Sequence, residues 1–592
     1  AVALIEKDKG VHIDIDKIDF DDKKVLASIG TGRTDGVFQL ESGGMKSFMK
    51  ELKPENLEDV IAGISLYRPG PMDFIPKYVK GKGSGAITYS CPQLEPILAP
   101  TYGCIVYQEQ VMQIVRDLGG YTLGRSDLVR RAMSKKKQSV MEKERANFIY
   151  GNEQEGVPGC VAGGISEQVA SQIYDDMMDF AKYAFNKSHA ACYAVVSYQT
   201  AYLKYYYPVE FMAALMTSVI DNPGKVAEYI MVCRNMGIAI LPPDINKGEG
   251  QFSVDGKSIR YALTAIKSVG RPVIEAVVGE RNERGLYTNL KDFITRMADK
   301  EVNKKAIENF IKAGAFDSLP GTRKQFMSAY VQIMERIIHD RKNNMAGQIS
   351  LFDIVDESQK EEFEVKLPDV GEYSKEMLLA FEKEVLGVYI SGHPLEEQEE
   401  LWRKGITNTT ADFMLDEETG AARVKDQSVV TIGGMIADKK IKYTKNDKVM
   451  SFLQVEDLVG SVEVIVFPRD YEKYSAKLME ENKVFIRGRV SVEEEKDGKL
   501  ICERITAFDE IPKKLWVRFP TMESYEKAQE ELFSLMADSD GRDGVVIYVE
   551  DKKVMKTLPP NKNVNADETL LEKLSGRFGK DNIKIVWNVK RD

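Results

Sequence analysis

Five cations fall within eight positions of the chain, in the segment RRAMSKKK. Paired arginines suit phosphate oxygens because each guanidinium presents a planar fork of donors, whereas lysines attract a polyanion as point charges. We therefore predict that Arg130 and Arg131 bind phosphate, and that Lys135, Lys136 and Lys137 attract a polyanion less selectively. The alternative interpretation is a solvated helix face that carries charge and binds no ligand.

A helix must position these cations. Leu128, Ala132 and Met133 have the spacing of a buried helix face, so the cations crowd the rest of the circumference and repel one another unless an anion is near. The formal net charge of -10 and the pI near 5.4 argue against indiscriminate coating of nucleic acid. Any nucleic acid must then be held by local basic patches such as this one.

The composition is that of an ordinary soluble protein of several domains. The 592 residues suggest roughly three to five domains, with 43% hydrophobic and 29% charged residues. The six cysteines form no C-x-x-C pair and the four histidines are scattered, so no zinc site is predicted. The absence of a signal peptide or a long apolar run favours the cytoplasm and excludes a membrane span. The opening AVALIEKDKG indicates a helix that ends at Gly10, so we expect the chain to begin inside a larger protein.

Hydrophobic periodicity changes along the chain. Residues 1 to about 245 are predicted to be mainly helical, with amphipathic stretches at 105–118 and 166–183. YALTAIKSVGRPVIEAVVGERN, from Tyr261, then predicts a helix, a tight hairpin and a second helix. Hairpin amides and a helix N-terminus can hold a backbone phosphate without reading sequence. Candidate DNA contacts there are Lys267, Ser268 and Gly270; a plain pair of helices is the alternative.

The second half contains a connector and β structure. An acidic, polar stretch around QISLFDIV is predicted to be a connector with one apolar segment. From Val429 hydrophobic and polar residues alternate with a period of two. Five strand candidates with one helix near 470–480 predict an OB barrel. The tail from Leu515 reads strand, helix, strand, helix, strand, which is typical of a small α/β module.

Several segments, taken in order, resemble the bacterial DNA polymerase III alpha subunit, a C-family replicative DNA polymerase. They are TDGVFQLESGGMKSFMKELKP (34–54), LYRPGPM (66–72), YGCIVYQEQVMQI (102–114), RRAMSKKK and YAFNKSHAACYAVVSYQTAYLKYYYP (183–208). The resemblance continues through LPPDIN, AIKSVG and LGVYISGHPL, and it fades in the last 80 residues.

The resemblance implies a multi-domain α+β chain. Its expected parts are mainly helical polymerase fingers (1–245), a helix-hairpin-helix duplex-binding domain (246–342), a clamp-binding connector with a helical segment (343–427), a five-stranded OB-fold barrel (428–512) and a small C-terminal α/β partner-binding domain (513–592). The implied activity is template-directed addition of deoxynucleotides to a primer 3′ end, a DNA-directed DNA polymerase reaction. This chain would supply binding of nucleotide, duplex DNA and sliding clamp.

Magnesium is the cofactor that the resemblance implies, bound by palm aspartates that we expect upstream of residue 1. The segment HIDIDKIDFDD offers Asp14 and Asp16, but it matches the family's linker between palm and fingers, so we do not read them as metal ligands. No catalytic or metal-binding residue is predicted in this chain, and the chain alone is expected to be inactive.

The resemblance also implies roles for the cations. Arg130 and Arg131 match fingers arginines over the active site, where an incoming deoxynucleoside triphosphate brings its phosphates, and the three lysines would lie near the template or primer backbone. In FNKSH, Lys187 would contact a phosphate or the backbone, while Asn186 and His189 could touch sugar or base. For His189 the alternative is a core histidine.

Two further features complete the expectations. Gln348, Leu351 and Phe352 match a Q-x-x-L-F peptide that resembles the family's sliding-clamp motif, the alternative being an ordinary connector. Ser268 stands where family hairpins commonly have glycine, so phosphate binding there is expected to be weaker or differently shaped.

In the family the C-terminal region contacts the clamp-loader assembly or single-stranded DNA, and here its partner stays unassigned. The rival to the polymerase hypothesis is a non-catalytic scaffold that binds DNA and tethers the clamp.

Overall fold

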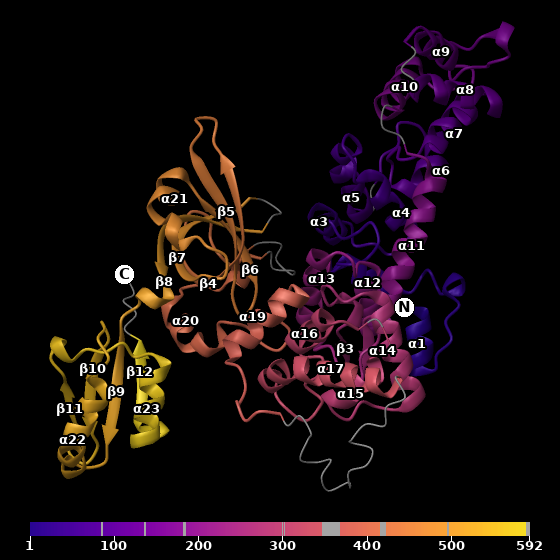
Figure 1. Cartoon of the computed structure of the whole chain (residues 1–592). Coiled ribbons are helices and arrows are strands. Elements are labelled where there is room, and N and C mark those ends of the chain that lie inside the picture. Colours follow the sequence, from indigo (N-terminus) through magenta and orange to yellow (C-terminus); the bar gives the residue numbers. More distant parts are fainter. Residues whose placement is uncertain are drawn as a thin grey trace. The chain divides into compact units, whose positions relative to one another are not determined.

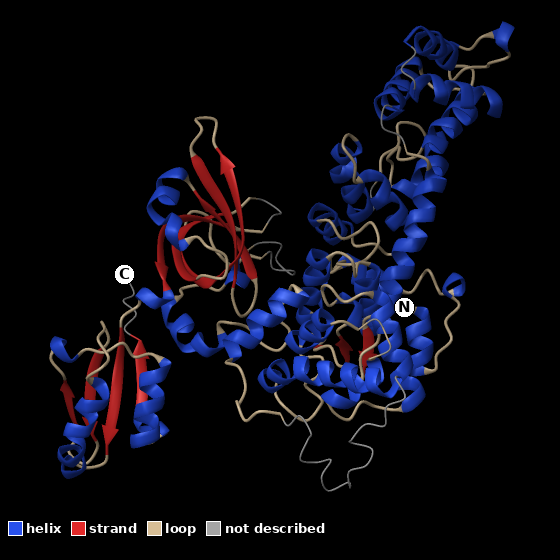
Figure 2. Ribbon diagram, viewed as in Figure 1, coloured by secondary structure: helices blue, strands red, loops and turns tan. Residues whose placement is uncertain are grey.

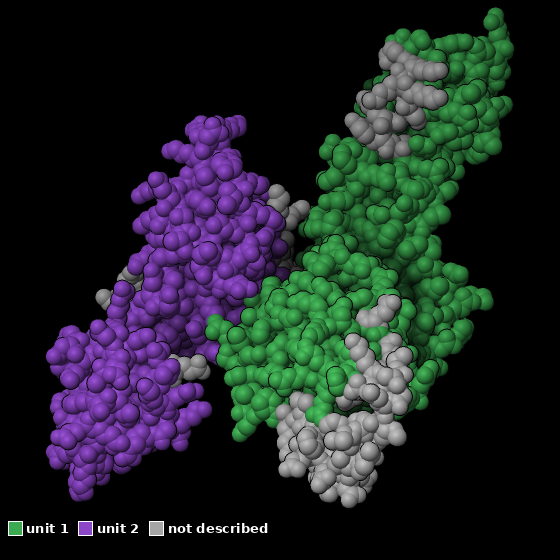
Figure 3. Space-filling model, in the orientation of Figure 1, with its two compact units in different colours: residues 1–392 green, residues 393–592 purple. Residues whose placement is uncertain are grey.

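The structure, a computed structural model, divides into two compact units, residues 1–392 and 393–592 (Figure 3). The described residues are 1–84, 87–134, 138–181, 185–298, 300, 302–345, 367–414, 422–493 and 497–587. No helix in these ranges is long and apolar enough to cross a membrane.

The first part of the chain is helical, as predicted (Figure 1). Its helices are α1 (Val2–Lys9), α2 (Lys23–Gly30), α3 (Gly43–Leu52), α4 (Leu57–Leu66), α5 (Ile75–Ser84), α6 (Glu95–Leu98), α7 (Gln108–Gly119), α8 (Leu123–Ser134), α9 (Gln138–Tyr150), α10 (Glu167–Ala181), α11 (Lys187–Tyr206), α12 (Pro208–Ser218) and α13 (Pro223–Asn235). The expected helices at 105–118 and 166–183 are α7 and α10. As predicted, α1 ends at Gly10, whose φ of 65° is left-handed.

Two hydrophobic cores support this helical region. The 20-residue helix α11 packs against α2, α4 and α12, and its Ala194 and Tyr198 are fully buried in the core shared with α2 and α4. A separate core lies among α7, α8, α9 and α10, around Ile114 and Met177. The cation-rich segment begins on α8, so its helix is fixed by this second core.

The predicted burial of Leu128 is wrong. Its side chain is 64% exposed, whereas Val129 is 2% and Ala132 8% exposed. Because α8 contacts α7, α9 and α10, the face that carries Ser126, Val129 and Ala132 is the buried one. Leu128 lies outside that face. The side chain of Met133 lies outside the described residues.

The segment after α13 forms a small sheet and the predicted hairpin. The strands are β1 (Ile240–Leu241), β2 (Ser253–Asp255) and β3 (Ser258–Arg260), in the order β1-β3-β2. Strands of two or three residues are too short for an alternating pattern, so the sequence did not predict them. The helix expected before the hairpin is only a 3-10 turn, Leu263–Ala265. Extended backbone at Ala262 and Ile266 on either side prevents a longer helix.

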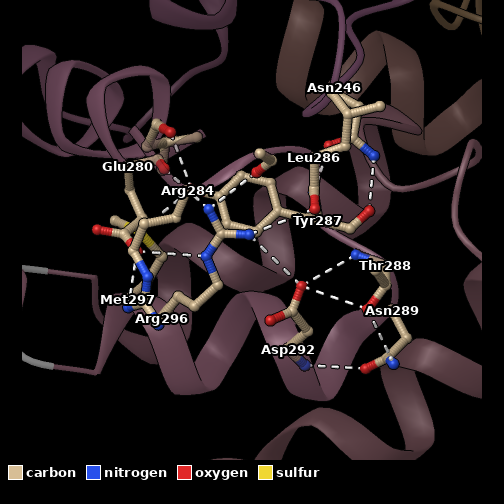
Figure 4. A network of polar contacts seen from close by, with 12 residues as sticks. Asn246, Glu280, Arg284, Leu286, Tyr287, Thr288, Asn289, Asp292, Arg296 and Met297 are labelled. Atoms are coloured by element: carbon tan, nitrogen blue, oxygen red, sulfur yellow. Dashed lines mark hydrogen bonds and ion pairs between the residues drawn. The ribbon is translucent and has the colours of Figure 1, made fainter. Parts of the chain in front are cut away.

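Helices follow the hairpin up to the end of the first unit. They are α14 (Arg271–Arg284), α15 (Leu290–Met297), α16 (Lys304–Ala313), α17 (Arg323–Met345) and α19 (Lys375–Leu386). Figure 4 shows how α14 and α15 are joined: the guanidinium of Arg296 lies 4.3 Å from the Tyr287 ring centre and donates to the Glu280 and Gly285 carbonyls at 2.8 and 2.9 Å. These bonds satisfy carbonyls at the C-terminal end of α14 and fix its direction.

A buried carboxylate holds the last residues of the first unit. Glu382 on α19 is fully buried and accepts hydrogen bonds from the amides of Ile390 and Ser391, both at 3.0 Å. The Arg323 guanidinium lies 3.4 Å from the same carboxylate and also binds Asp317. The charge of Glu382 is therefore balanced by one cation and two backbone donors.

The second unit contains the predicted barrel (Figure 2). After α20 (Glu399–Gly405) come β4 (Val429–Tyr443), β5 (Val449–Glu456), β6 (Ser461–Val466), α21 (Pro468–Tyr474), β7 (Lys483–Ser491) and β8 (Lys499–Ala507). The five strands close in the order β4-β5-β6-β8-β7. Alternate residues such as Ile432, Val464 and Ile486 fill the interior, so the period-two pattern produced the correct strands.

The C-terminal module has one strand more than predicted. It comprises β9 (Lys513–Phe519), α22 (Met522–Met536), β10 (Gly544–Val549), β11 (Val554–Thr557), α23 (Glu568–Phe578) and β12 (Ile583–Trp587), with strand order β11-β10-β9-β12. The additional strand β11 is four residues long and wholly exposed, so it has no alternation to detect. The predicted multi-domain α+β class, with helical fingers, hairpin, barrel and small α/β module, is confirmed.

Candidate functional site

Arg130 and Arg131 on α8 share one carboxylate. Nε and Nη2 of Arg130 donate to Oδ1 of Asp127 at 2.9 and 2.6 Å, and Nε of Arg131 lies 2.7 Å from Oδ2. Hydrogen bonds from Arg130, together with the charges of both arginines, hold the pKa of Asp127 below its ordinary value. Asp127 balances only one of the two positive charges.

Arg130 also connects α8 to the start of α7. Its Nη1 donates to Oε1 of Gln108 at 2.7 Å, and the Gln108 amide donates to the Phe185 carbonyl at 2.9 Å. Tyr107 and Phe185 form a parallel bridge, which sets the N-termini of α7 and α11 side by side. The fold thus connects Arg130, through Gln108, to the segment FNKSH, which begins more than fifty positions later in the sequence. We refer to the site formed by Asp127, Arg130, Arg131 and Lys187 as the cationic corner.

Lys187 is the first residue of α11 and is held by acidic side chains. Its amide donates to both carboxylate oxygens of Glu109 at 3.2 Å, and its ammonium lies 2.9 Å from Glu58 and 5.3 Å from the Tyr107 ring centre. Asn186 caps the helix, because its Oδ1 accepts the amide of His189 at 3.0 Å. The cap leaves the Asn186 side-chain amino group able to donate to a ligand.

His189 is exposed on α11 and belongs to a row of rings. Its ring centre lies 4.6 Å from that of Tyr193 and 5.4 Å from that of Phe185. Tyr193 stacks on Phe38 at 5.4 Å with an interplanar angle of 17°, and the Arg68 guanidinium lies 3.7 Å above the centre of the Phe185 ring. The row therefore runs from Phe38 to Arg68 in continuous contact.

This row borders a cavity of about 520 Å³, lined by residues of three separate segments, 38–45, 64–68 and 185–193. Sequence reasoning placed only His189 there and missed Phe38, Arg68, Phe185 and Tyr193. The last four lie in segments that carried the family resemblance, but no local spacing linked them. The aromatic character of Phe38, Phe185 and Tyr193 was the available signal, since exposed aromatics near a basic motif can mark a nucleic-acid or nucleotide site.

The predicted hairpin residues lie at the start of α14, and part of the hairpin is already engaged. The Lys267 ammonium donates to the Glu384 carbonyl at 3.0 Å, and its amide donates to Val385 at 2.9 Å. Ser268 has the left-handed φ of 60° that glycine adopts more easily. Among the described residues, the amides of Ser268 and Gly270 have no hydrogen-bond partner. These two amides are the donors that a phosphate could use.

Six predicted contacts lie outside the described residues. They are Lys135, Lys136 and Lys137 between α8 and α9, and Gln348, Leu351 and Phe352 in the connector.

The described residues do not form a magnesium site. Within those ranges, no group of three or more histidine, cysteine, aspartate or glutamate side chains is placed to hold a metal ion. Asp14 caps a 3-10 turn and lies 2.7 Å from the Lys17 ammonium, while Asp16 accepts from the Gln199 side chain at 3.3 Å. Both carboxylates are thus engaged within the protein, and the described residues hold no group that fits the magnesium ions, whose ligands the resemblance assigns to aspartates upstream of residue 1.

Known protein families match three parts of the chain. Residues 1–156 match the bacterial DNA polymerase III alpha subunit finger domain, residues 237–326 a helix-hairpin-helix motif, and residues 430–507 an OB-fold nucleic acid binding domain. DNA polymerase III subunit alpha of Borreliella burgdorferi is 36% identical over 572 residues, which cover 95% of this chain and 48% of that protein. The Bacillus subtilis protein of the same name is 36% identical over 98% of this chain and 50% of its own length.

The chain belongs to the DNA polymerase III alpha subunit family. It spans about half the length of these curated relatives. The Thermus aquaticus alpha subunit is 37% identical over 91% of the chain and 43% of its own length. Among solved structures, the OBody AM1L10 bound to hen egg-white lysozyme is 19% identical over 17% of this chain and 92% of its own chain, with a TM-score of 0.14. The cationic corner includes α8 of the region that matches the alpha subunit finger domain.

Proposed function

We propose that this chain contributes binding of nucleotide, primer-template DNA and sliding clamp to the DNA polymerase III alpha subunit, which adds deoxynucleotides to a primer 3′ end. The convergence of Arg130 and Lys187 carries the proposal. Arg130 bonds to Gln108, the first residue of α7, and Lys187 is the first residue of α11; the bridge between Tyr107 and Phe185 sets these two helix N-termini side by side, where helix dipoles also favour an anion. A triphosphate suits this arrangement. In this proposal the chain supplies no magnesium ligand.

Binding of the chain to deoxynucleoside triphosphates tests the proposal. We expect the 592-residue chain to bind dATP in a calorimetric titration, and the double variant Arg130→Ala, Arg131→Ala to bind it far more weakly while binding primer-template duplex almost as well. Arg145→Ala is a matched control, because Arg145 is also paired with a carboxylate, Asp175, but lies on α9. Unchanged dATP affinity in the double variant would support the solvated-face interpretation instead.

Primer extension separates the polymerase hypothesis from its rival. The chain alone should not extend a primer in magnesium and all four nucleotides, since positioned phosphates still require metal-binding carboxylates. Extension above a buffer control would point to carboxylates of this chain, with Asp14 and Asp16 first to be replaced. A chain that binds DNA and clamp but no nucleotide would favour the scaffold.

Sliding-clamp binding by the connector is proposed from its sequence. A Leu-Phe pair in a polar stretch of sequence suits an apolar pocket on a partner, while the Gln348 amide can hydrogen-bond at the rim. Replacing Leu351 and Phe352 by alanine should weaken clamp binding by about 2 kcal/mol, or roughly thirtyfold, and leave duplex binding unchanged. Equal clamp affinities for the wild type and the double variant would contradict this assignment.

A further inference from the structure

A four-residue turn forms the hairpin before α14. The Val269 amide donates to the Ile266 carbonyl at 3.3 Å and closes the turn. Ser268, the third residue, has a φ of 60°, whereas Lys267, the second residue, does not have a positive φ. This combination defines a type II turn, because the third residue of a type I turn has a φ of about -90°. A serine enters the type II turn only at a cost, since its Cβ is crowded in the left-handed region, so another contact must favour the observed turn.

Asn309 on α16 supplies such a contact. Its side chain is 2% exposed, and its Nδ2 donates to the Lys267 carbonyl at 2.7 Å. Turns of types I and II differ by a flip of the peptide unit between their second and third residues. Here that unit joins Lys267 to Ser268, so a type I turn would point the Lys267 carbonyl away from Asn309 and break this hydrogen bond. Asn309 therefore stabilises the type II turn relative to the type I turn.

The same hydrogen bond orients the Ser268 amide. In a trans peptide unit the C=O and N–H bonds point in opposite directions, and no peptide bond of the described residues is cis. Because the Lys267 carbonyl points to a buried side chain, the N–H of Ser268 points away from that side chain, and Ser268 itself is exposed. This N–H is one of the two hairpin amides that a phosphate could use. A flip of the peptide unit would turn it away from such a ligand.

Two further observations support a specific role for Asn309. Lys267 is also held at the C-terminal end of α19, where its amide donates to the Val385 carbonyl at 2.9 Å and its ammonium to the Glu384 carbonyl at 3.0 Å. The turn therefore cannot follow a flipped peptide unit by moving as a whole. Among the described residues, the buried Oδ1 of Asn309 accepts no hydrogen bond. A buried acceptor without a partner is costly, so the asparagine is explained by what its amino group donates to and not by packing.

We propose that Asn309 is a positioning residue for duplex DNA: it holds the turn from Ile266 to Val269 in the form that presents the Ser268 amide to a backbone phosphate. This role rests on the proposed function, in which the chain binds primer-template DNA. The Asn309 side chain is buried and acts on DNA only through the turn. It lies 42 positions after Lys267, so no sequence motif connected the two residues.

The test combines a loss with a rescue, measured by fluorescence anisotropy of a primer-template duplex titrated with the 592-residue chain. We expect Asn309→Leu, which removes the amino group, to weaken duplex binding about tenfold. Because the lost donor is a neutral amide, the slope of log affinity against log salt should stay unchanged. Adding Ser268→Gly should restore the affinity to within about twofold, since glycine adopts the left-handed φ without help and keeps the amide.

Asn246→Leu is the matched control. Asn246 also belongs to the region 237–326 that matches the helix-hairpin-helix motif, and its Nδ2 also donates to a backbone carbonyl, that of Tyr287 at 2.8 Å (Figure 4). Its replacement should lower the free energy of unfolding but leave the duplex affinity and the salt slope unchanged. Asn309→Ala removes the amino group without adding bulk, and it replaces Asn309→Leu in the test if urea denaturation shows that the leucine variant is not folded.

The outcomes separate this role from the function on which it rests. The role of Asn309 is overturned, with DNA binding intact, if its replacement leaves the duplex affinity unchanged, if Ser268→Gly does not restore a lost affinity, or if the salt slope falls by about one unit, which would indicate a lost cation. It is also overturned if neither Asn309 variant folds, because the residue would then support the whole fold. If the wild-type chain does not bind the duplex, the proposed DNA binding fails and this role fails with it.

Discussion

The cationic corner and the hairpin at Ser268 are both candidate phosphate sites, but they offer different donors. At the corner, Arg130 and Arg131 share Asp127, and the Lys187 ammonium lies beside Glu58. At the hairpin, the amides of Ser268 and Gly270 have no partner among the described residues, and the single lysine is bonded to a carbonyl. A phosphate at the corner must compete with carboxylates, whereas one at the hairpin only replaces water. Counting cations in the sequence therefore overstates the free charge of the corner.

The largest effect should distinguish the two arginines. Arg130 is half-buried and oriented by Gln108 and Asp127, while Arg131 is 62% exposed. We expect Arg130→Ala to weaken dATP binding about thirtyfold, the range of a charged hydrogen-bonded contact, and Arg131→Ala about fivefold. Calorimetric titration of dATP into both variants measures the ratio of the two losses in affinity. Equal losses would mean that orientation at the corner is unimportant and that only its charge matters.

Removing the competing carboxylate should sharpen the contrast with the hairpin. Asp127→Asn removes the negative charge that both arginines share, so tripolyphosphate affinity should rise by a few-fold while duplex DNA binding at the hairpin stays unchanged. Because hydrogen bonds to Arg130 lower the pKa of Asp127, the ion pairs persist at neutral pH and acid would release them only below the ordinary carboxyl pKa of about 4. An unchanged or weaker tripolyphosphate affinity would show that Asp127 mainly positions the arginines.

Salt dependence of duplex binding should rank the lysines. Each of Lys135→Ala, Lys136→Ala and Lys137→Ala should reduce the slope of log affinity against log salt by about one unit if that lysine contacts a phosphate. Lys267→Ala should reduce it by less, because the Lys267 ammonium already donates to the Glu384 carbonyl. Fluorescence anisotropy with a primer-template duplex at several salt concentrations gives these slopes. A larger change for Lys267 than for the other three would reverse the ranking.

The smallest effect concerns the shape of the hairpin. Ser268→Gly relieves a left-handed residue and should raise the free energy of unfolding by about 0.5 kcal/mol without reducing duplex affinity, since the amide remains. Gly270→Ala is the matched change, because Gly270 has a φ of -71° and an added Cβ would meet only Pro272 at 3.6 Å. It should alter stability by less than about 0.5 kcal/mol. Denaturation by urea measures the free energy of unfolding of both variants. If Ser268→Gly lowered it, the Ser268 hydroxyl would have a structural role.

The fold was predictable where side chains alternate or repeat with helical spacing. The barrel strands follow a period of two because one face of each is buried, and the sequence therefore gave their positions closely. The prediction of a helix before the hairpin was wrong. The Tyr261 amide donates to the Leu241 carbonyl of the small sheet, and no local sequence pattern reveals this contact. The edge strand β11 was missed because all four of its residues are exposed.

The candidate site was predictable only in part. The pairing of Asp127 with Arg130 and Arg131 could have been inferred, because i,i+3 and i,i+4 neighbours meet on a helix. The aromatic row could not, since Phe38 and Tyr193 lie more than 150 positions apart and meet only through the packing of α11. The left-handed φ of 65° at Gln39 was likewise invisible, because the contacts of Thr200 and Ser197 with the neighbouring Phe38 backbone leave no local sequence signal.

The buried Glu382 determines where the chain can be shortened. Since this carboxylate holds the Ile390 and Ser391 amides, a protein that ends after Gly392 would keep its new terminus hydrogen-bonded to α19 rather than loose in solvent. A cut a few residues earlier would remove both donors and leave a buried negative charge with Arg323 as its remaining partner among those described above. A protease or a designed fragment that cuts after Gly392 therefore leaves the first unit with these hydrogen bonds intact, whereas a cut a few residues earlier destabilises it.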